Sequence, residues 1–127
     1  YKQNPEANLL ICPSDQLINK PEIFEKACKT AFDFVENNDS LVTFGVQPDH
    51  PNTGYGYIQF DDVDAETKPV KRFTEKPDLE KAQNFIESGD YLWNAGIFAW
   101  NTQTIIDEFK YVVYERIVGT PLNSCFL

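Results

Sequence analysis

Apolar residues group into short continuous runs that alternate with longer stretches of helical spacing. Residues 8–15 (NLLICPSD) form an apolar run that stops at a proline, which predicts a strand buried on both faces. Apolar residues then recur at helical intervals over 19–39, which indicates a helix with Pro21 in its first turn and Asn19 as its N-cap. The β-branched and aromatic run at 41–47 is typical of a second strand. Together these elements predict a right-handed βαβ unit.

The next part of the chain has the composition of a loop followed by strands. Two prolines and two glycines in residues 48–62 mark a structured loop. Residues 55–60 are predicted to form a strand, and residues 68–77 are the expected antiparallel partner of that strand. A further aromatic strand is predicted at 91–101.

Two more helices complete the predicted order. Residues 78–90 have a helical pattern, with Asp78 as the expected N-cap and Gly89 as the left-handed residue at the C-terminus. Residues 102–117 form a last amphipathic pattern, with Thr102 as its candidate cap. The order β-α-β, a β-pair and α-β-α predicts an α/β fold with a mostly parallel sheet and an antiparallel excursion.

Composition places the chain among soluble globular proteins. Its 127 residues suit one domain, and 42% of them are hydrophobic and 24% charged. The 20 acidic residues outnumber the 11 basic ones, for a net charge of -9. A nucleic-acid partner is therefore not expected, because binding of the phosphate backbone normally needs a basic face. The acidity fits a site that recruits a divalent cation before an anionic ligand.

Cysteine usage and hydropathy indicate a cytoplasmic protein. The three cysteines, Cys12, Cys28 and Cys125, are odd in number and lack a CxxC spacing, so we expect reduced and mostly buried thiols. No apolar run approaches the roughly 20 residues that span a bilayer, and no secretory signal opens the chain. A membrane partner is not expected.

An aspartate follows the first predicted strand, at the place where ligands of open α/β sheets collect. Asp15 in CPSDQ (12–16) can hold Mg²⁺, with waters and phosphate oxygens in the other ligand positions. The alternative is that Ser14 or Asp15 caps a turn or the next helix. Taken alone, the pattern favours the cap.

A pair of glycines enters the strand predicted at 55–60. Gly54 and Gly56 bracket Tyr55 in NTGYGYI (52–58), and glycines let backbone amides and carbonyls approach a ligand. The pattern is not GxGxxG and no helix follows it, which argues against a dinucleotide site. By itself, the pattern favours the alternative of a tight turn that enters a strand.

Two opposite charges stand where the fourth predicted strand meets a helix. In FTEKP (73–77), the carboxylate of Glu75 can accept two sugar hydroxyls, and the ammonium of Lys76 is a compact charge suited to phosphate. The alternative is a solvated turn in which Pro77 stops the strand.

A small-residue pair follows an asparagine in LWNAGIFAW (92–100). The Asn94 amide can donate and accept hydrogen bonds to ring hydroxyls, while Ala95 and Gly96 leave room beside it. The alternative is a turn asparagine before a buried strand.

The order of these motifs, PSD, TGYGYI, EKP and WNAGIF, resembles the sugar-1-phosphate nucleotidyltransferases. The motifs P-x-x-P-x-TGYGYI and YLWNAGIF are similar to those of the mannose-1-phosphate guanylyltransferase branch of that family. The resemblance covers about residues 8–110 and leaves 111–127 unassigned. It implies a single, partial nucleotidyltransferase domain with a Rossmann-like sheet.

The resemblance also implies a reaction and a set of site residues. Members of that branch transfer GMP from GTP to mannose 1-phosphate, with Mg²⁺ as cofactor. It implies that Asp15 ligates the metal, and that Asp15 and Lys76 are catalytic, with Lys76 on the sugar phosphate. The residues that it assigns to substrate binding are Gly54, Tyr55, Gly56, Glu75, Lys76, Asn94 and Gly96.

Two departures from the family pattern limit what this segment is expected to do. Gln16 follows the PSD aspartate where the family commonly has histidine. The glycine-rich signature G-G-x-G-[ST]-R-L-x-P, which cradles the triphosphate in the family, does not occur in these residues. We therefore expect a segment that holds the sugar-phosphate side of the site, with an exposed sheet edge that permits homo-oligomers.

Two other functions remain open at this point. One is the same reaction with another sugar or base, because base choice lies largely in the family's glycine-rich part. The other is a non-catalytic domain that binds a sugar phosphate or regulates a partner.

Overall fold

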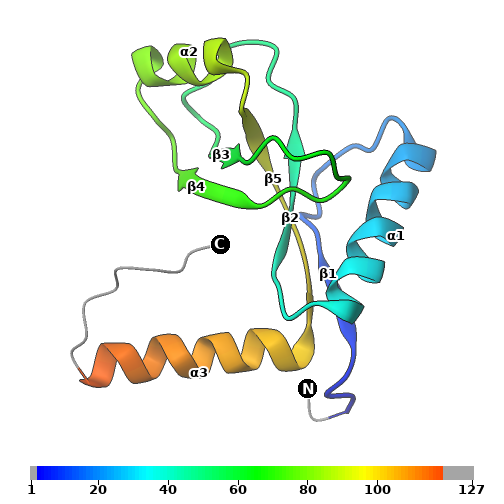
Figure 1. Ribbon diagram of the computed structural model, residues 1–127. Helices are drawn as coiled ribbons and strands as arrows, with labels where there is room; N and C mark the ends of the chain where they lie inside the picture. Colours follow the sequence, from blue (N-terminus) through cyan, green and yellow to red (C-terminus); the bar gives the residue numbers. More distant parts are fainter. Residues whose placement is uncertain (1–2, 119–127) are drawn as a thin grey trace. The chain divides into compact units, whose positions relative to one another are not determined.

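The computed structural model describes residues 3–118, with side chains to residue 111. Helices are interspersed with strands along the chain, which confirms the α/β class (Figure 1). The elements are β1 (Asn8–Ile11), α1 (Pro21–Asn37), β2 (Val42–Val46), β3 (Tyr57–Phe60), β4 (Val70–Thr74), α2 (Leu79–Ser88), β5 (Tyr91–Asn101) and α3 (Thr102–Val118).

The five strands belong to one sheet in which β5 has three partners. The order is β1-β5-β3-β4, and β2 also pairs with β5. β1 with β5, β3 with β5, and β3 with β4 are antiparallel pairs, so the predicted antiparallel partner of β3 is confirmed. The parallel character that the βαβ pattern predicted is not seen in these pairs, because β1 and β2 both pair with β5 instead of with each other.

The described chain divides into two compact units. The first takes in the chain up to Val42 and from Ile97 on, with β1, α1, the end of β5 and α3. The second is Thr43–Gly96, with most of β2, all of β3, β4 and α2, and the start of β5.

In the first unit, α1 buries Ala31 and Val35 and packs on β1. Leu9 and Ile11 alternate outward and are 37% and 47% exposed, so the prediction of a strand buried on both faces was wrong. The physical reason is that α1 packs on β1 and the burial of the β1 residues alternates, so only one face of the strand is covered. Cys12 is also exposed, contrary to expectation, whereas Cys28 is partly buried and Cys125 lies outside the described residues.

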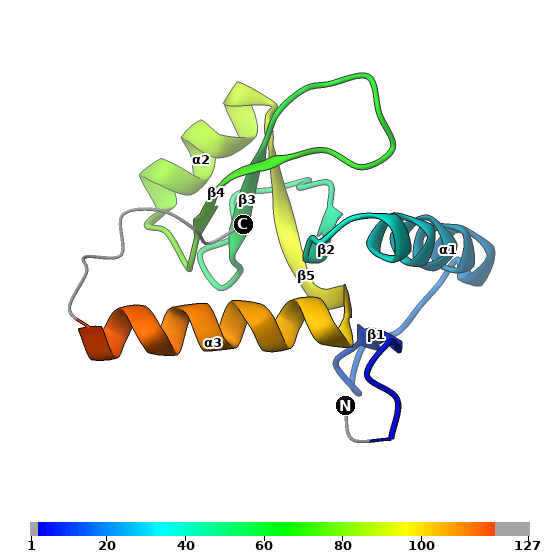
Figure 2. The same ribbon diagram turned by 60° about the horizontal axis from the view of Figure 1, so that its bottom comes forward.

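Two predicted helix caps are displaced by one residue. Lys20, not Asn19, is the N-cap of α1, and it makes no side-chain capping bond because a lysine side chain has no hydrogen-bond acceptor. At α3, which continues from the end of β5 (Figure 2), Asn101 Oδ1 accepts the Gln103 N–H at 2.8 Å. The Thr102 hydroxyl and N–H instead donate to the Ala7 carbonyl, at 2.7 and 2.9 Å, and tie the helix start to the segment before β1.

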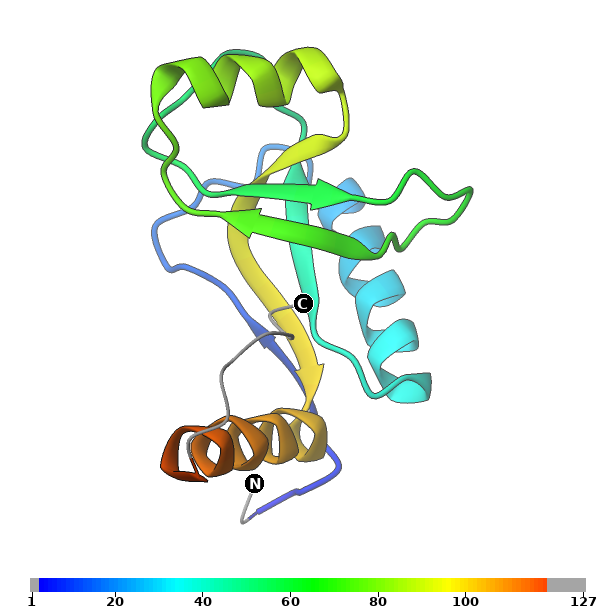
Figure 3. The same cartoon turned by 60° about the vertical axis from the view of Figure 1, so that its left-hand side comes forward.

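The second unit has its core between β3, α2 and β5. Tyr57, Ala82 and Tyr91 form a buried cluster, and Phe85 stacks on Tyr91 with ring centroids 4.0 Å apart. Trp93 packs against the same cluster. Figure 3 shows β3 and β4 side by side in this unit. This core fixes the ends of the strands that carry the candidate site.

Both predicted caps of α2 are confirmed. The Asp78 carboxylate accepts the Lys81 N–H at 2.9 Å, and Gly89 has φ 77° with its N–H donated to the Ile86 carbonyl. The left-handed conformation at Gly89 is easily adopted without a Cβ. Among the residues that the structure describes, no helix is long and apolar enough to cross a membrane.

We expect the cap of α2 to make stability depend on pH. The hydrogen bond from Lys81 Nζ, with the backbone bond, holds the pKa of Asp78 below its ordinary value of 3.8. A depressed carboxyl pKa contributes stability above the unfolded-state value, and that stability is lost as pH falls through the folded-state value. Asp78→Asn keeps an acceptor but does not titrate, so urea unfolding below about pH 4 should show a shallower pH slope than the wild type.

Asp64→Asn, on the exposed β3–β4 loop, is the matched control for the loss of one negative charge. Identical pH slopes for wild type and Asp78→Asn would show that the cap is not linked to folding.

Candidate functional site

Three of the residues singled out in the sequence meet at Gly56 in the second unit. The Gly56 carbonyl accepts the Asn94 N–H at 2.8 Å, just before the β3–β5 ladder begins. A Cβ on Gly56 would lie 2.9 Å from Glu75 Oε2, 3.3 Å from Phe73 Cε1 and 3.6 Å from Asn94 Cβ. Only glycine fits this buried position without moving Glu75, so the turn, the acid and the amide form one cluster.

Hydrogen bonds fix the orientation of the Asn94 amide. Its Oδ1 accepts the Thr43 hydroxyl at 3.0 Å and the Gly96 N–H at 3.1 Å. The amide nitrogen is therefore the group that Asn94 can offer as a donor to a ligand. Gly96 has φ 69°, a left-handed conformation that favours glycine.

Glu75 and Lys76 form the charged corner after β4. Their side chains are 62% and 64% exposed, and Lys76 Nζ lies 3.7 Å from Glu75 Oε1. An exposed pair at this distance contributes little to stability. Both charged groups are accessible to a ligand.

The backbone of Lys76 is in a conformation that its residue type disfavours. Its φ is 40°, and it is the one non-glycine residue with positive φ in the described part of the chain. A left-handed conformation costs a residue with a Cβ about 1–2 kcal/mol. Buried Pro77 follows directly. Glycine would suit this backbone conformation better than lysine.

Gly54 and Tyr55 are held by the loop that leads into β3. The Gly54 N–H donates to Asn52 Oδ1 at 2.8 Å, and a Cβ on Gly54 would lie 3.1 Å from that oxygen. The Tyr55 ring is half exposed and meets Trp93 edge to face, with centroids 5.1 Å apart. Both residues thus belong to a turn anchored to β5.

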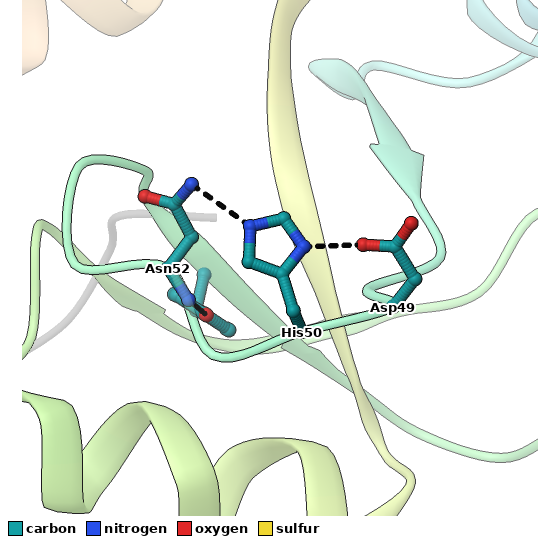
Figure 4. Close-up of polar contacts among 4 residues, drawn as sticks. Asp49, His50 and Asn52 are labelled. Carbon is teal, nitrogen blue, oxygen red and sulfur yellow. Dashed lines mark hydrogen bonds and ion pairs between the residues drawn. The ribbon is translucent and has the colours of Figure 1, made fainter.

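Three polar residues of this loop were missed by the sequence reasoning. His50 Nδ1 lies 2.5 Å from Asp49 Oδ1, and His50 Nε2 lies 3.3 Å from Asn52 Nδ2 (Figure 4). The Asn52 N–H also donates to the Tyr57 hydroxyl at 3.0 Å. The signal in the sequence was that His50 is the one histidine of the chain and lies between two prolines.

Asp15 lies in the first unit, in an exposed turn after β1. The other predicted site residues are all in the second unit. No group of three or more histidine, cysteine, aspartate or glutamate side chains suited to a metal occurs within residues 3–111. A single exposed carboxylate still fits Mg²⁺, which is often bound by one or two carboxylates together with substrate phosphates and water.

Comparison with known proteins agrees with the motif order. A family model described as nucleotidyl transferase matches residues 1–113. A mannose-1-phosphate guanylyltransferase of Escherichia coli is 38% identical over 115 residues, which are 85% of this chain and 25% of that protein. The crystal structure of a mannose-6-phosphate isomerase from Helicobacter pylori has a TM-score of 0.77 and 41% identity, over 85% of this chain and 40% of the other.

A second solved structure supports the same fold. The protein named mannose-1-phosphate geranyltransferase from Thermus thermophilus has a TM-score of 0.78 and 28% identity, over 95% of this chain and 37% of the other. The chain thus spans about a quarter of the E. coli relative, which is 25% covered. The family match ends at residue 113.

We predict that Gly56→Ala displaces Glu75 while the unit stays folded. The new Cβ meets the end of an exposed, flexible side chain, so the loss in unfolding free energy should be about 1 kcal/mol, at the low end for overpacking. The displacement is measured as a change in the ¹³C shift of the Glu75 carboxyl. Gly54→Ala is the matched control, because its Cβ would approach Asn52 and leave the Glu75 signal unchanged. Equal shifts in both variants would contradict the close approach at Gly56.

Proposed function

This chain belongs to the nucleotidyl transferase family, and on that premise we propose that it carries the sugar-phosphate side of a mannose-1-phosphate guanylyltransferase. The reaction transfers GMP from GTP to mannose 1-phosphate and gives GDP-mannose and pyrophosphate. The observation that carries the proposal is the cluster of Gly56, Glu75 and Asn94 beside a lysine held in a disfavoured conformation. It supplies acceptors and donors for hydroxyl groups and a cation for phosphate.

In this proposal each side chain of the second unit has a separate task. The Glu75 carboxylate accepts two sugar hydroxyls, and the Asn94 amide nitrogen donates to a third oxygen of the ring. Gly56 leaves space for the ring where a Cβ would push Glu75 aside. The Lys76 ammonium holds the sugar phosphate as a point charge.

The reaction needs positioning and charge neutralisation more than covalent chemistry from the protein. A phosphate oxygen of mannose 1-phosphate attacks the α-phosphorus of GTP in line, and a new P–O bond forms. The bond from the α-phosphorus to the bridging oxygen breaks, and pyrophosphate leaves with that electron pair. Lys76 neutralises charge on the attacking phosphate and holds it in line.

We also propose Asp15 as a ligand of Mg²⁺, which when bound supplies positive charge to the phosphate oxygens. The proposal includes a single nucleotidyltransferase domain, of which residues 8–110 are the part with family motifs, and a cytoplasmic location. GTP binding is assigned to the family's glycine-rich part, which this sequence does not contain. A chain that bound mannose 1-phosphate equally with and without Mg²⁺, and had no nucleotide partner, would favour the non-catalytic alternative.

Lys76 is predicted to increase the affinity for the ligand and, through its backbone conformation, to lower the stability of the protein. Lys76→Ala should weaken mannose 1-phosphate binding about tenfold, the loss expected for one charged hydrogen bond. Lys76→Gly should lose the same affinity but be more stable than Lys76→Ala by about 1 kcal/mol, because glycine adopts φ 40° without strain. Titration calorimetry and urea unfolding measure the two effects.

Lys81→Ala is the matched control, because Lys81 is an equally exposed lysine that caps α2 through Asp78. It should change stability and leave the affinity for mannose 1-phosphate unchanged. If Lys76→Ala lowered stability alone, the corner would be a structural turn.

We further predict that these 127 residues alone do not form GDP-mannose at a useful rate. The reason is that the triphosphate is bound in this family by the glycine-rich signature. A coupled pyrophosphate-release assay with the E. coli relative as reference measures the difference. Turnover comparable with that of the reference would overturn the proposal that this sequence carries only the sugar-phosphate side of the site.

A further inference from the structure

The loop at residues 49–54 contains a chain of hydrogen bonds that only one protonation state of His50 can complete. The Gly54 N–H donates to Asn52 Oδ1, so this oxygen is the acceptor end of the amide. The other end, Nδ2, carries two hydrogens and faces His50 Nε2 at 3.3 Å. Because Nδ2 is a donor only, Nε2 must be the unprotonated nitrogen of the ring.

The second ring nitrogen completes the assignment. A neutral imidazole with no proton on Nε2 carries it on Nδ1, which faces the Asp49 carboxylate at 2.5 Å (Figure 4). The Nδ1–H therefore donates to Asp49. If His50 takes up a second proton, Nε2–H and the Asn52 amide become two donors that face each other. The Asn52 amide must then turn, and its bond to the Gly54 N–H is lost.

This chain of bonds is attached to both strands that form the candidate site. The Asn52 N–H donates to the hydroxyl of Tyr57, which is fully buried on β3 next to Gly56. The His50 ring meets Trp93 of β5 edge to face at 5.0 Å, and Trp93 precedes Asn94. The position of the Gly54–Tyr55–Gly56 turn relative to Asn94 thus depends on this loop.

We propose that His50 is a positioning residue for the sugar-phosphate site, which in its neutral form holds the Gly54–Gly56 turn in place through Asn52. The proposal rests on the proposed function, since the ligand of that turn is a sugar phosphate. Protonation of His50 loosens the turn and weakens binding of the ligand. His50 does not itself contact the reacting atoms.

The two hydrogen-bond contacts of the His50 ring respond differently to a second proton. Asp49 is the charged residue that contacts the ring within the described part of the chain. Trp93 from β5 and the amide of Asn52, which also contact the ring, carry no charge. In the candidate site, the charges of Glu75 and Lys76 pair with each other. A second proton on the ring thus leaves the Asp49 contact in place and breaks the Asn52 contact.

The test uses a substitution that reverses the proton requirement. Asn52→Asp keeps an acceptor for the Gly54 N–H, but its second oxygen also accepts, so it bonds His50 only when Nε2 is protonated. His50→Phe keeps an aromatic ring against Trp93 and removes both hydrogen bonds. Mannose 1-phosphate affinity is measured for wild type, each single variant and the double variant at about pH 8 and about pH 5, the limits between which histidines change charge.

The comparison with His50→Phe removes the ligand's own titration, because phosphate ionises equally in every arm. Relative to His50→Phe, wild type should bind about three- to tenfold more tightly at the higher pH, as one hydrogen bond allows, and lose that advantage at the lower pH. Asn52→Asp should have its larger advantage over the double variant at the lower pH, where both ring nitrogens donate, because a neutral ring can donate to only one of the two carboxylates. Parallel pH profiles for wild type and Asn52→Asp would overturn the proposal.

A readout without ligand separates this inference from the proposed function. In the wild type at the higher pH, ¹⁵N spectra should place the ring proton on Nδ1, and exchange protection of the Gly54 amide should fall on acidification. If both spectroscopic results are obtained but mannose 1-phosphate does not bind, the proposed function is refuted. The role of His50 in holding the turn is then retained, without that ligand. A ring proton on Nε2, or a Gly54 amide indifferent to pH in all variants, would refute the role of His50.

Discussion

The close approach of Glu75 to the Cα of Gly56 is the constraint on which the candidate site depends. Because a Cβ would lie 2.9 Å from the carboxylate, the acid can sit against the turn only if residue 56 has no side chain. The hydrogen bond from the Asn94 backbone N–H to the Gly56 carbonyl places residue 94, which carries the side-chain amide, beside the same turn. The absence of a side chain at residue 56 thus lets an acid that follows β4 and an asparagine within β5 approach the same turn.

In the proposed site, stability and ligand binding make opposite demands on residue 76. The core of Tyr57, Ala82 and Tyr91 and the capped ends of α2 hold the strands around it. Lys76, next to that rigid frame, has a left-handed backbone that glycine would adopt with less strain. Strain of this kind persists where the surrounding structure fixes it, and it is common at ligand sites. The frame therefore supports a conformation that the residue alone would avoid.

The loop before β3 also holds the glycine turn of the candidate site in place. His50, Asn52 and Gly54 are joined by hydrogen bonds, and Trp93 and Tyr57 attach them to β5 and β3. A neutral histidine satisfies this arrangement in one tautomer only. The orientation of the glycine turn is thereby connected to a side chain outside the predicted site.

The sequence by itself determined the elements whose causes are local. Asp78 caps α2 by bonding an N–H three residues on, Gly89 ends it with positive φ, and the β3–β4 pair joins neighbouring strands, so short-range chemistry was enough. Only the tertiary structure decided that Leu9 and Ile11 are exposed, that β5 pairs with both β1 and β2, and that Gly56 must lack a side chain. These features depend on contacts between segments distant in the chain, which spacing and propensity do not encode.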